Sequence, residues 1–161
     1  MKDLILIACY FAHLVATVLW VGGIIFILFF AMPSSKQVLG AESGRLMGEI
    51  SKRFTPAANL SIIVLVMTGA VLAGLNRQYS GIAFLANSWS SALTVKSILI
   101  FVMIAVHFYR GLILGPTIMR TTAEIEKKSM QKLSINLVRV NFALGLLVLL
   151  VSGTLSILRG Y

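Results

Sequence analysis

The chain has 161 residues, of which 58% are hydrophobic and 12% are charged, and its mean hydropathy is +0.96. A soluble domain carries about a quarter charged residues, so this composition excludes an ordinary soluble fold and indicates an integral membrane domain. The formal net charge is +9, but the basic residues alternate with apolar segments instead of gathering on one soluble face, which argues against nucleic-acid binding. A single cysteine, Cys9, excludes an intrachain disulfide.

Four apolar segments are long enough to cross a bilayer, which takes about 20 helical residues. In chain order they are residues 4–32, 56–75, 92–114 and 137–158. Backbone in hydrocarbon must satisfy its own hydrogen bonds, so each segment is predicted to be a helix. The first segment is too long for a signal peptide and lacks a cleavage motif, so we expect it to remain. The predicted fold is all-α, a four-helix membrane bundle in one domain, residues 1–161.

Three prolines mark the expected ends of these segments. Pro33 and Pro116 follow the first and third segments, where a proline ends a helix, and Pro56 opens the second segment at a first-turn position. Between them, Gly40–Ser51 spaces its apolar residues as an interfacial helix would. Its three glycines at intervals of four weaken a helix, so an ordinary connecting loop is an equally good interpretation of this segment.

Basic residues are unevenly distributed between the connections. Those after the first and third segments contain Lys36, Arg45, Lys52, Arg53, Arg120, Lys127, Lys128 and Lys132. The opposite side contains only Lys2, Arg77 and Arg159. The positive-inside rule therefore places the basic connections in the cytoplasm, and both termini and Asn76–Ser91 on the outer side. We expect a multi-pass protein of a bacterial or archaeal cytoplasmic membrane.

His13, Lys96 and His107 lie inside apolar segments, where ionisable groups are costly and mark a functional site by default. His13 lies about 16 Å deep at ~1.5 Å per residue, near the middle of the bilayer, and His107 lies roughly 10 Å deeper. Two imidazoles on one iron need similar depths, so straight helices would not provide this pair. Either a tilted first helix brings His13 and His107 to similar depths, or only one histidine binds the iron. In the second case Met103, Lys96 or water is the ligand on the other side of the iron.

Structural roles for the two histidines are the alternative. His13 would then form an interhelical hydrogen bond to a Ser, Thr or Asn side chain, a common contact between membrane helices. His107, beside Tyr109 and Arg110, would then lie at the level of the lipid headgroups.

The remaining polar side chains near the segments have two interpretations each. Lys96 has no acidic partner in any segment, so it either extends its ammonium outward or holds an anionic group such as a haem propionate or a quinone oxygen. Arg53 and Arg139 lie at cytoplasmic ends, where headgroup phosphates explain them. Asn59 and Asn141 are expected to form hydrogen bonds across helices, with ligand contact as the alternative.

Cys9 and His13 stand four residues apart, on one helical face, as a pair of soft metal ligands would. Met67 and Met103 would extend such a set for Cu(I), although methionines in apolar helices usually pack.

Short motifs spread over most of the chain resemble a known family. The motifs are His13-Leu14, Trp20-Val21-Gly22-Gly23, Arg53-Phe54, Thr68-Gly69 and Lys96, which resemble the CopD superfamily, and Thr55-Pro56-Ala57 and Val106-His107-Phe108-Tyr109, which resemble its HemJ branch. HemJ-type proteins are membrane protoporphyrinogen oxidases associated with haem b, and CopD proteins are associated with copper uptake or resistance. The resemblance implies that His13, Arg53 and Lys96 correspond to the functional histidine, arginine and lysine of HemJ. Asn141 stands where many CopD-type sequences have an acidic residue, which argues against a cation path.

We therefore predict a membrane oxidoreductase or electron-transfer protein that binds haem b and acts on a quinone-like or porphyrinogen-like reductant. The metal ligands are His13 and His107, Lys96 and Arg53 are the candidate catalytic residues and also hold cofactor, and Trp20 and Asn141 complete the cofactor contacts. The alternatives are a Cu(I) uptake or resistance protein of the CopD type and an accessory membrane subunit without chemistry. The pair Gly111 and Gly115 fits either a homodimer contact or close packing within one bundle.

Overall fold

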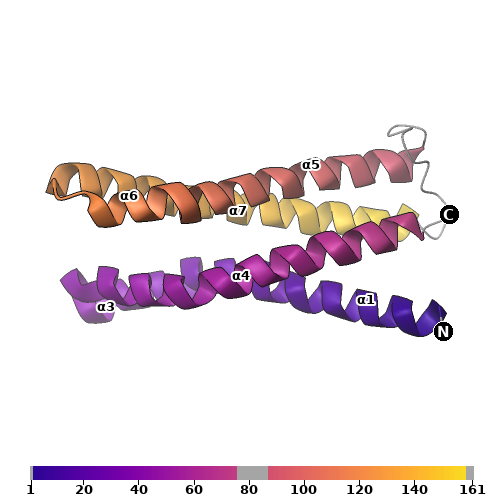
Figure 1. Cartoon of the computed structure of the whole chain (residues 1–161), viewed down its shortest axis with the longest axis horizontal. Helices are drawn as coiled ribbons and strands as arrows, with labels where there is room; N and C mark the ends of the chain where they lie inside the picture. The colour runs from indigo at the N-terminus through magenta and orange to yellow at the C-terminus, as the bar shows by residue number, and fades with distance from the viewer. Residues whose placement is uncertain (1, 76–86, 159–161) are drawn as a thin grey trace. The chain divides into compact units, whose positions relative to one another are not determined.

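The computed structural model describes residues 2–75 and 87–158 (Figure 1). Nearly all of these residues are helical and none of them is in a strand, which confirms the predicted all-α class. They form two compact units, residues 2–75 and residues 87–158, and each unit is described by itself. Most of the predicted outer segment Asn76–Ser91, with Arg77, lies outside the described residues, as does Arg159.

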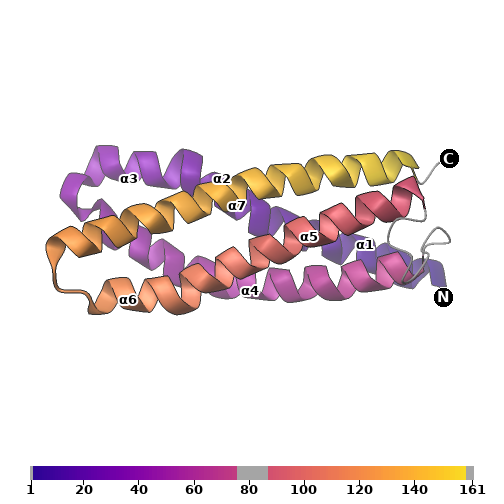
Figure 2. The ribbon, with the colours of Figure 1, turned by 90° about the horizontal axis from the view of Figure 1, so that it is seen from above.

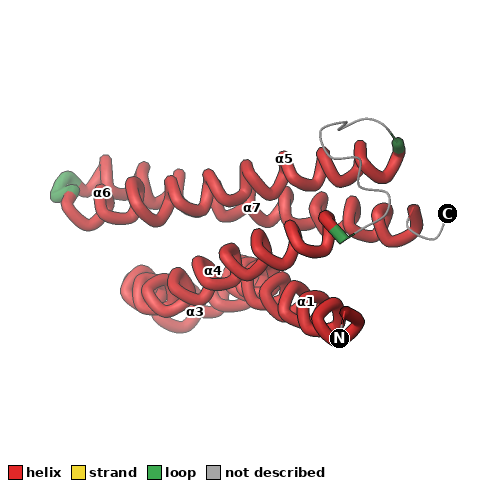
Figure 3. Tube along the Cα trace, turned by 45° about the vertical axis from the view of Figure 1, so that its right-hand side comes forward, coloured by secondary structure: helices red, strands yellow, loops and turns green. Residues whose placement is uncertain are grey.

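The first unit is a helical hairpin. Its outgoing arm is an almost unbroken helical rod made of α1 (Lys2–Thr17), η1 (Val18–Gly22), α2 (Gly23–Phe26), η2 (Ile27–Ala31) and α3 (Met32–Leu39). After the short turn η3 (Gly40–Glu42), α4 (Ser43–Gly74) returns and packs along the rod (Figures 1 and 3). The reversal needs Gly40, because its φ of +49° lies in a region that side chains disfavour.

The second unit is also a hairpin. Its first arm is α5 (Ser88–Phe108), η4 (Tyr109–Leu114) and α6 (Gly115–Arg120), and α7 (Glu124–Leu158) returns along α5 (Figure 2). Asn87 caps α5, since its side-chain oxygen accepts a hydrogen bond of 2.7 Å from the Ser90 N–H. Glu124 and Glu126 lie in the first turn of α7, where negative charge is favourable to the helix dipole.

Pro33 and Pro116 do not end a helix and Pro56 does not open one, so these predictions are wrong. Pro33 and Pro116 each follow a π-helical segment, η2 and η4, by two residues, and the helix continues to Leu39 and Arg120. A proline lacks an N–H and its ring displaces the carbonyl four residues earlier, and the wider π turn accommodates both effects. Pro56 lies inside α4, 13 residues after its start at Ser43.

The segment Gly40–Ser51 is neither a separate interfacial helix nor a loop. Its first three residues form the η3 turn, and the rest is the first part of α4. In that part, Lys52 pairs with Glu49 at 2.7 Å, and this contact lowers the pKa of the Glu49 carboxyl. The basic residues of the connection therefore lie on helical surface.

The described helices have the length and composition of membrane spans. Three helical stretches qualify, Asp3–Gly74, Ser88–Arg120 and Glu124–Leu158, and the first includes both arms of its hairpin. At most 22% of the residues in their most apolar windows are buried in protein. Such exposed apolar surface is stable in lipid, so the chain is an integral membrane protein. Four crossings and the outer location of both termini stay predictions.

Candidate functional site

Most hydroxyl side chains in the apolar helices bond to their own backbone. Thr17, Ser61 and Thr94 each donate to the carbonyl four residues earlier, at 2.8–2.9 Å. This is the usual way for a serine or threonine to satisfy its hydroxyl inside a helix. The polar contacts that join one helix to another are therefore the informative ones, and the two considered below join α1 to α4 and α5 to α7.

In the first unit, the imidazole of His13 on α1 contacts α4. Its Nδ1 lies 2.8 Å from Oγ1 of Thr68, and that hydroxyl donates its own proton to the Val64 carbonyl at 2.6 Å. A hydroxyl has one proton, so toward His13 it accepts, and Nδ1 carries the hydrogen. The lone pair of the neutral ring then lies on Nε2. The structure thus shows the interhelical hydrogen bond that was the structural alternative for His13, and its role as a metal ligand stays a prediction.

The surroundings of His13 are close-packed but include a second soft donor. Gly69 follows Thr68 on α4, and a Cβ added there would lie 3.6 Å from Cε1 of His13. Cys9 lies one turn before His13 on α1, and both residues are half-buried. A histidine whose Nδ1–H is held by a hydrogen bond is the usual arrangement of a metal-ligating histidine. The first cluster of interest is thus Cys9, His13 and Thr68.

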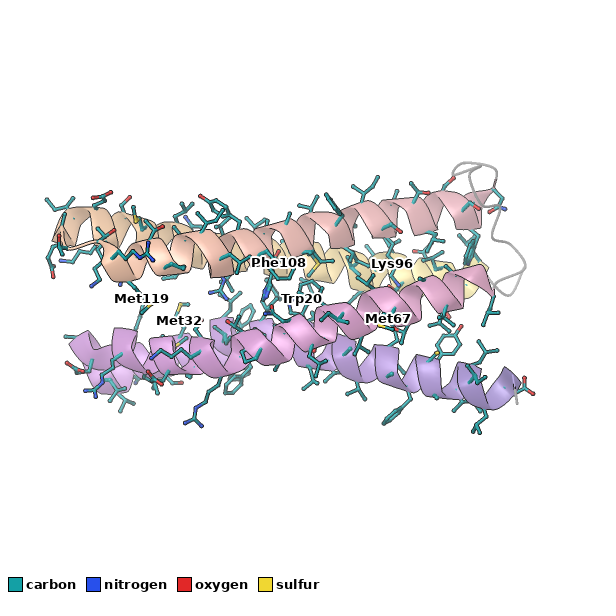
Figure 4. All side chains as sticks on the ribbon, viewed as in Figure 1. Trp20, Met32, Met67, Lys96, Phe108 and Met119 are labelled. Atoms are coloured by element: carbon teal, nitrogen blue, oxygen red, sulfur yellow. The ribbon has the colours of Figure 1, made fainter. Side chains whose placement is uncertain are left out.

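Trp20 and Arg53, also in the first unit, have different environments. Trp20 lies in η1 with only 2% of its surface exposed (Figure 4). Arg53 is exposed on α4, whereas its neighbour Phe54 packs its ring against Gly23 of α2. Arg53 therefore lies beside a helix contact without being part of it, and its role toward a cofactor or headgroups stays a prediction.

In the second unit, α5 and α7 are joined by a buried amide. Asn141 on α7 is 5% exposed, and its Nδ2 donates to the carbonyl of Met103 on α5 at 3.3 Å. Its Oδ1 is buried and has no hydrogen-bond partner among the residues described. Leaving a buried acceptor unpaired costs about 1–3 kcal/mol. The predicted interhelical bond of Asn141 is confirmed, and its role in contacting a cofactor stays a prediction.

His107 lies on the same face of α5 as Met103. It is four residues further on, and the two side chains are 4% and 1% exposed. In a regular helix the His107 N–H is directed at the Met103 carbonyl, which also accepts from Asn141. The imidazole meets the Phe108 ring edge-on, at 5.4 Å between centroids. The second cluster of interest is thus Met103, His107 and Asn141.

Lys96 lies two turns before Met103 on α5 and is half-buried (Figure 4). No carboxylate of the described segments pairs with it, because the ion pairs found there are those of Lys52 and Lys128. It belongs to neither cluster, and its role in holding an anionic group stays a prediction.

The two histidines belong to different units, so a metal centre shared by His13 and His107 stays a prediction. Among residues 2–75 and 87–158, no group of three or more His, Cys, Asp or Glu side chains could hold a metal ion. Sequence reasoning did not identify Thr68 as the partner of His13 or the Met103 carbonyl as the partner of Asn141. The sequence contained one indication of the contact between His13 and Thr68. In the Thr68-Gly69 pair, a hydroxyl group is next to a glycine, which lets another helix approach.

Together, the helical hairpins and their exposed apolar surface define a helical membrane protein. The family model described as copper resistance protein D, CopD, matches residues 48–155. The chain belongs to the CopD family. No curated protein and no solved structure matches it. The family match includes the second cluster and Thr68, and it favours the copper alternative over the haem hypothesis.

Proposed function

We propose that the chain takes part in copper uptake or resistance by carrying Cu(I) through the bilayer. The observation that carries the proposal is the buried pair Met103 and His107, one turn apart on α5 within the segment that matches CopD. Thioether and imidazole groups are soft ligands of the kind that Cu(I) prefers. An apolar helix provides neither water nor carboxylates, and these two groups can bind the ion in their place.

The arrangement of the donors supports passage of the ion. Soft donors occur as pairs, Cys9 with His13 on α1 and Met103 with His107 on α5. Transport requires sites that bind firmly enough for an ion to enter and weakly enough for it to leave, and two-donor sites suit that requirement. The Met103–His107 pair is neutral, so there a monovalent ion brings less uncompensated charge into hydrocarbon than a divalent one, and Cys9 would bind the ion as a thiolate.

The proposal is tested with the purified full-length chain in liposomes that contain a Cu(I) chelator. We expect saturable copper entry above that of protein-free liposomes. Ag(I), which is also soft and monovalent, should compete with copper, and Zn(II) should not. Entry equal to that of protein-free liposomes would contradict the proposal.

A b-type haem is the second candidate, and one observation favours it. The hydrogen bond from Nδ1 of His13 to Thr68 leaves the lone pair on Nε2, which is what an axial ligand of haem iron needs. His13 would hold the iron, and Arg53 of the same unit would hold a propionate or substrate. When bound, haem supplies one-electron chemistry, with a quinone as the natural membrane partner. An absorption spectrum of the purified chain, with and without dithionite, distinguishes this candidate by its Soret band.

A further inference from the structure

The second cluster contains an unused acceptor at a well-defined place. Asn141 Nδ2 is directed at the Met103 carbonyl, so the amide orientation is fixed and Oδ1 must be the other atom. That oxygen is fully buried and unpaired within the described part of the chain. A buried polar atom without a partner needs an explanation, and a role in contacting a ligand supplies one.

Helix geometry brings two further side chains, those of Met103 and His107, to the level of this oxygen. Side chains on a helix lean toward its N-terminus, so the His107 imidazole covers the turn that begins at Met103. Asn141 is hydrogen-bonded to that same turn. The thioether of Met103, the imidazole of His107 and the amide oxygen of Asn141 therefore lie at one level of the α5–α7 contact, and all three residues are at least 95% buried.

The charges around the cluster select among ions. The three side chains are neutral donors, and residues 88–120 and 127–158 contain no acidic residue. On α5 and its continuation, Lys96 lies two turns before Met103, and Arg110 lies three residues after His107. Two nearby cations oppose the entry of a divalent ion more strongly than that of a monovalent one. Only an ion that gains strongly from sulfur and nitrogen ligands offsets this repulsion.

We infer that Met103, His107 and Asn141 form a Cu(I) site between α5 and α7. Met103 Sδ and an imidazole nitrogen of His107 are the ligands, and Asn141 Oδ1 is a third, weaker contact that orients the site. The identity of the ion rests on the proposed function, whereas the three residues come from the structure of the second unit.

X-ray absorption at the copper edge tests the ligands directly. The full-length Cys9→Ser variant is loaded with one equivalent of Cu(I), so that any sulfur ligand is a thioether. We expect both copper–sulfur and copper–nitrogen scattering, and loss of the sulfur contribution when Met103→Leu is added. Scattering from light atoms alone in the Cys9→Ser variant would overturn the inference.

Competition with a coloured Cu(I) chelator measures the contribution of each residue. Met103→Leu and His107→Gln are each expected to weaken Cu(I) binding by more than about 10-fold, and Asn141→Leu by about 10-fold, at the lower end of the range for ligand-orienting residues. Met119→Leu on α6 is the matched control, because Met119 is 79% exposed and lies outside the cluster. Circular dichroism checks that each variant keeps its helices.

The outcomes separate this inference from the proposed function. If the variants weaken binding and the wild-type chain carries no copper into liposomes, the site stands and the transport proposal falls. If copper enters liposomes and the three variants bind as tightly as Met119→Leu, the transport proposal stands and the site falls. A wild-type chain that binds no Cu(I) overturns both.

Discussion

A single hydroxyl decides the chemistry of His13. Thr68 gives its proton to the Val64 carbonyl, and its oxygen therefore accepts from Nδ1 of His13. The ring is held in one tautomer and one orientation with the lone pair on Nε2. Sequence reasoning identified His13 as a special residue because imidazoles are rare in hydrocarbon. It could not identify Thr68, since most threonines in such helices bond to their own turn and only helix rotation brings this one to His13.

The role of Thr68 is testable by substitution. Thr68→Val keeps the shape of the side chain and removes the hydroxyl, so we expect His13 to shift toward the tautomer with hydrogen on Nε2. Nitrogen NMR of labelled histidine in detergent distinguishes the two tautomers. Thr55→Val on the same helix is the control, because the Thr55 hydroxyl bonds to the Ser51 carbonyl. Identical His13 signals in wild type and Thr68→Val would show that the hydrogen bond does not select the tautomer.

At the scale of helices, the prolines show where sequence rules reach their limit. The rule that proline ends a helix assumes a regular α-helix, and it failed at Pro33 and Pro116 because the chain widens into η2 and η4 before each of them. Pro56 is accommodated within α4. In a membrane the alternative to a widened helix is a broken one with unsatisfied backbone groups, which is more costly. The existence of helices was therefore predictable, and their ends were not.

The contact between α2 and α4 depends on a glycine. A Cβ at Gly23 would overlap the Phe54 ring, with Cζ at only 2.8 Å, so Gly23→Ala is expected to destabilise the chain by about 1–3 kcal/mol. Chemical unfolding in detergent, followed by circular dichroism, measures the change. Adding Phe54→Leu should recover part of the loss, because the smaller side chain leaves room for the methyl group.

Gly48→Ala on α4 is the control for that substitution. A Cβ at Gly48 meets nothing within 4 Å, so alanine should stabilise the helix by up to about 1 kcal/mol. If Gly23→Ala and Gly48→Ala had the same effect, the close contact with Phe54 would not determine the packing of the first unit.

At the scale of the whole chain, composition predicted the class of protein and the family match confirmed the CopD part of the resemblance. Apolar content and segment length suffice to predict the class of protein, because lipid requires every span to be an apolar helix that is long enough to cross the bilayer. The polar residues of both clusters except Thr68 were also visible as exceptions in apolar segments. The grouping of these residues into two clusters could not be predicted from the sequence, since it depends on which helices pack against each other.

Membrane topology is the main untested prediction at this scale. In a Cys9→Ser background, Ala41→Cys in the η3 turn and Ala123→Cys before α7 should react with a membrane-impermeant maleimide only after the cells are opened. Ser88→Cys, at the start of α5, should react in intact cells whose outer barrier has been removed. This pattern follows from the excess of basic residues near the first two positions. The opposite pattern would place both termini in the cytoplasm.

The π segments also affect how this chain is compared with its relatives. A residue inserted into an α-helix rotates everything beyond it by about 100°. A π turn takes up such an extra residue, so a relative that lacks one residue within Tyr109–Leu114 would form a regular α-helix there and present the same faces of α5 and α6. In an uninterrupted apolar run such a gap leaves little trace in an alignment. Position-by-position equivalence beyond residue 114 should therefore be assigned by superposing helices rather than by matching letters.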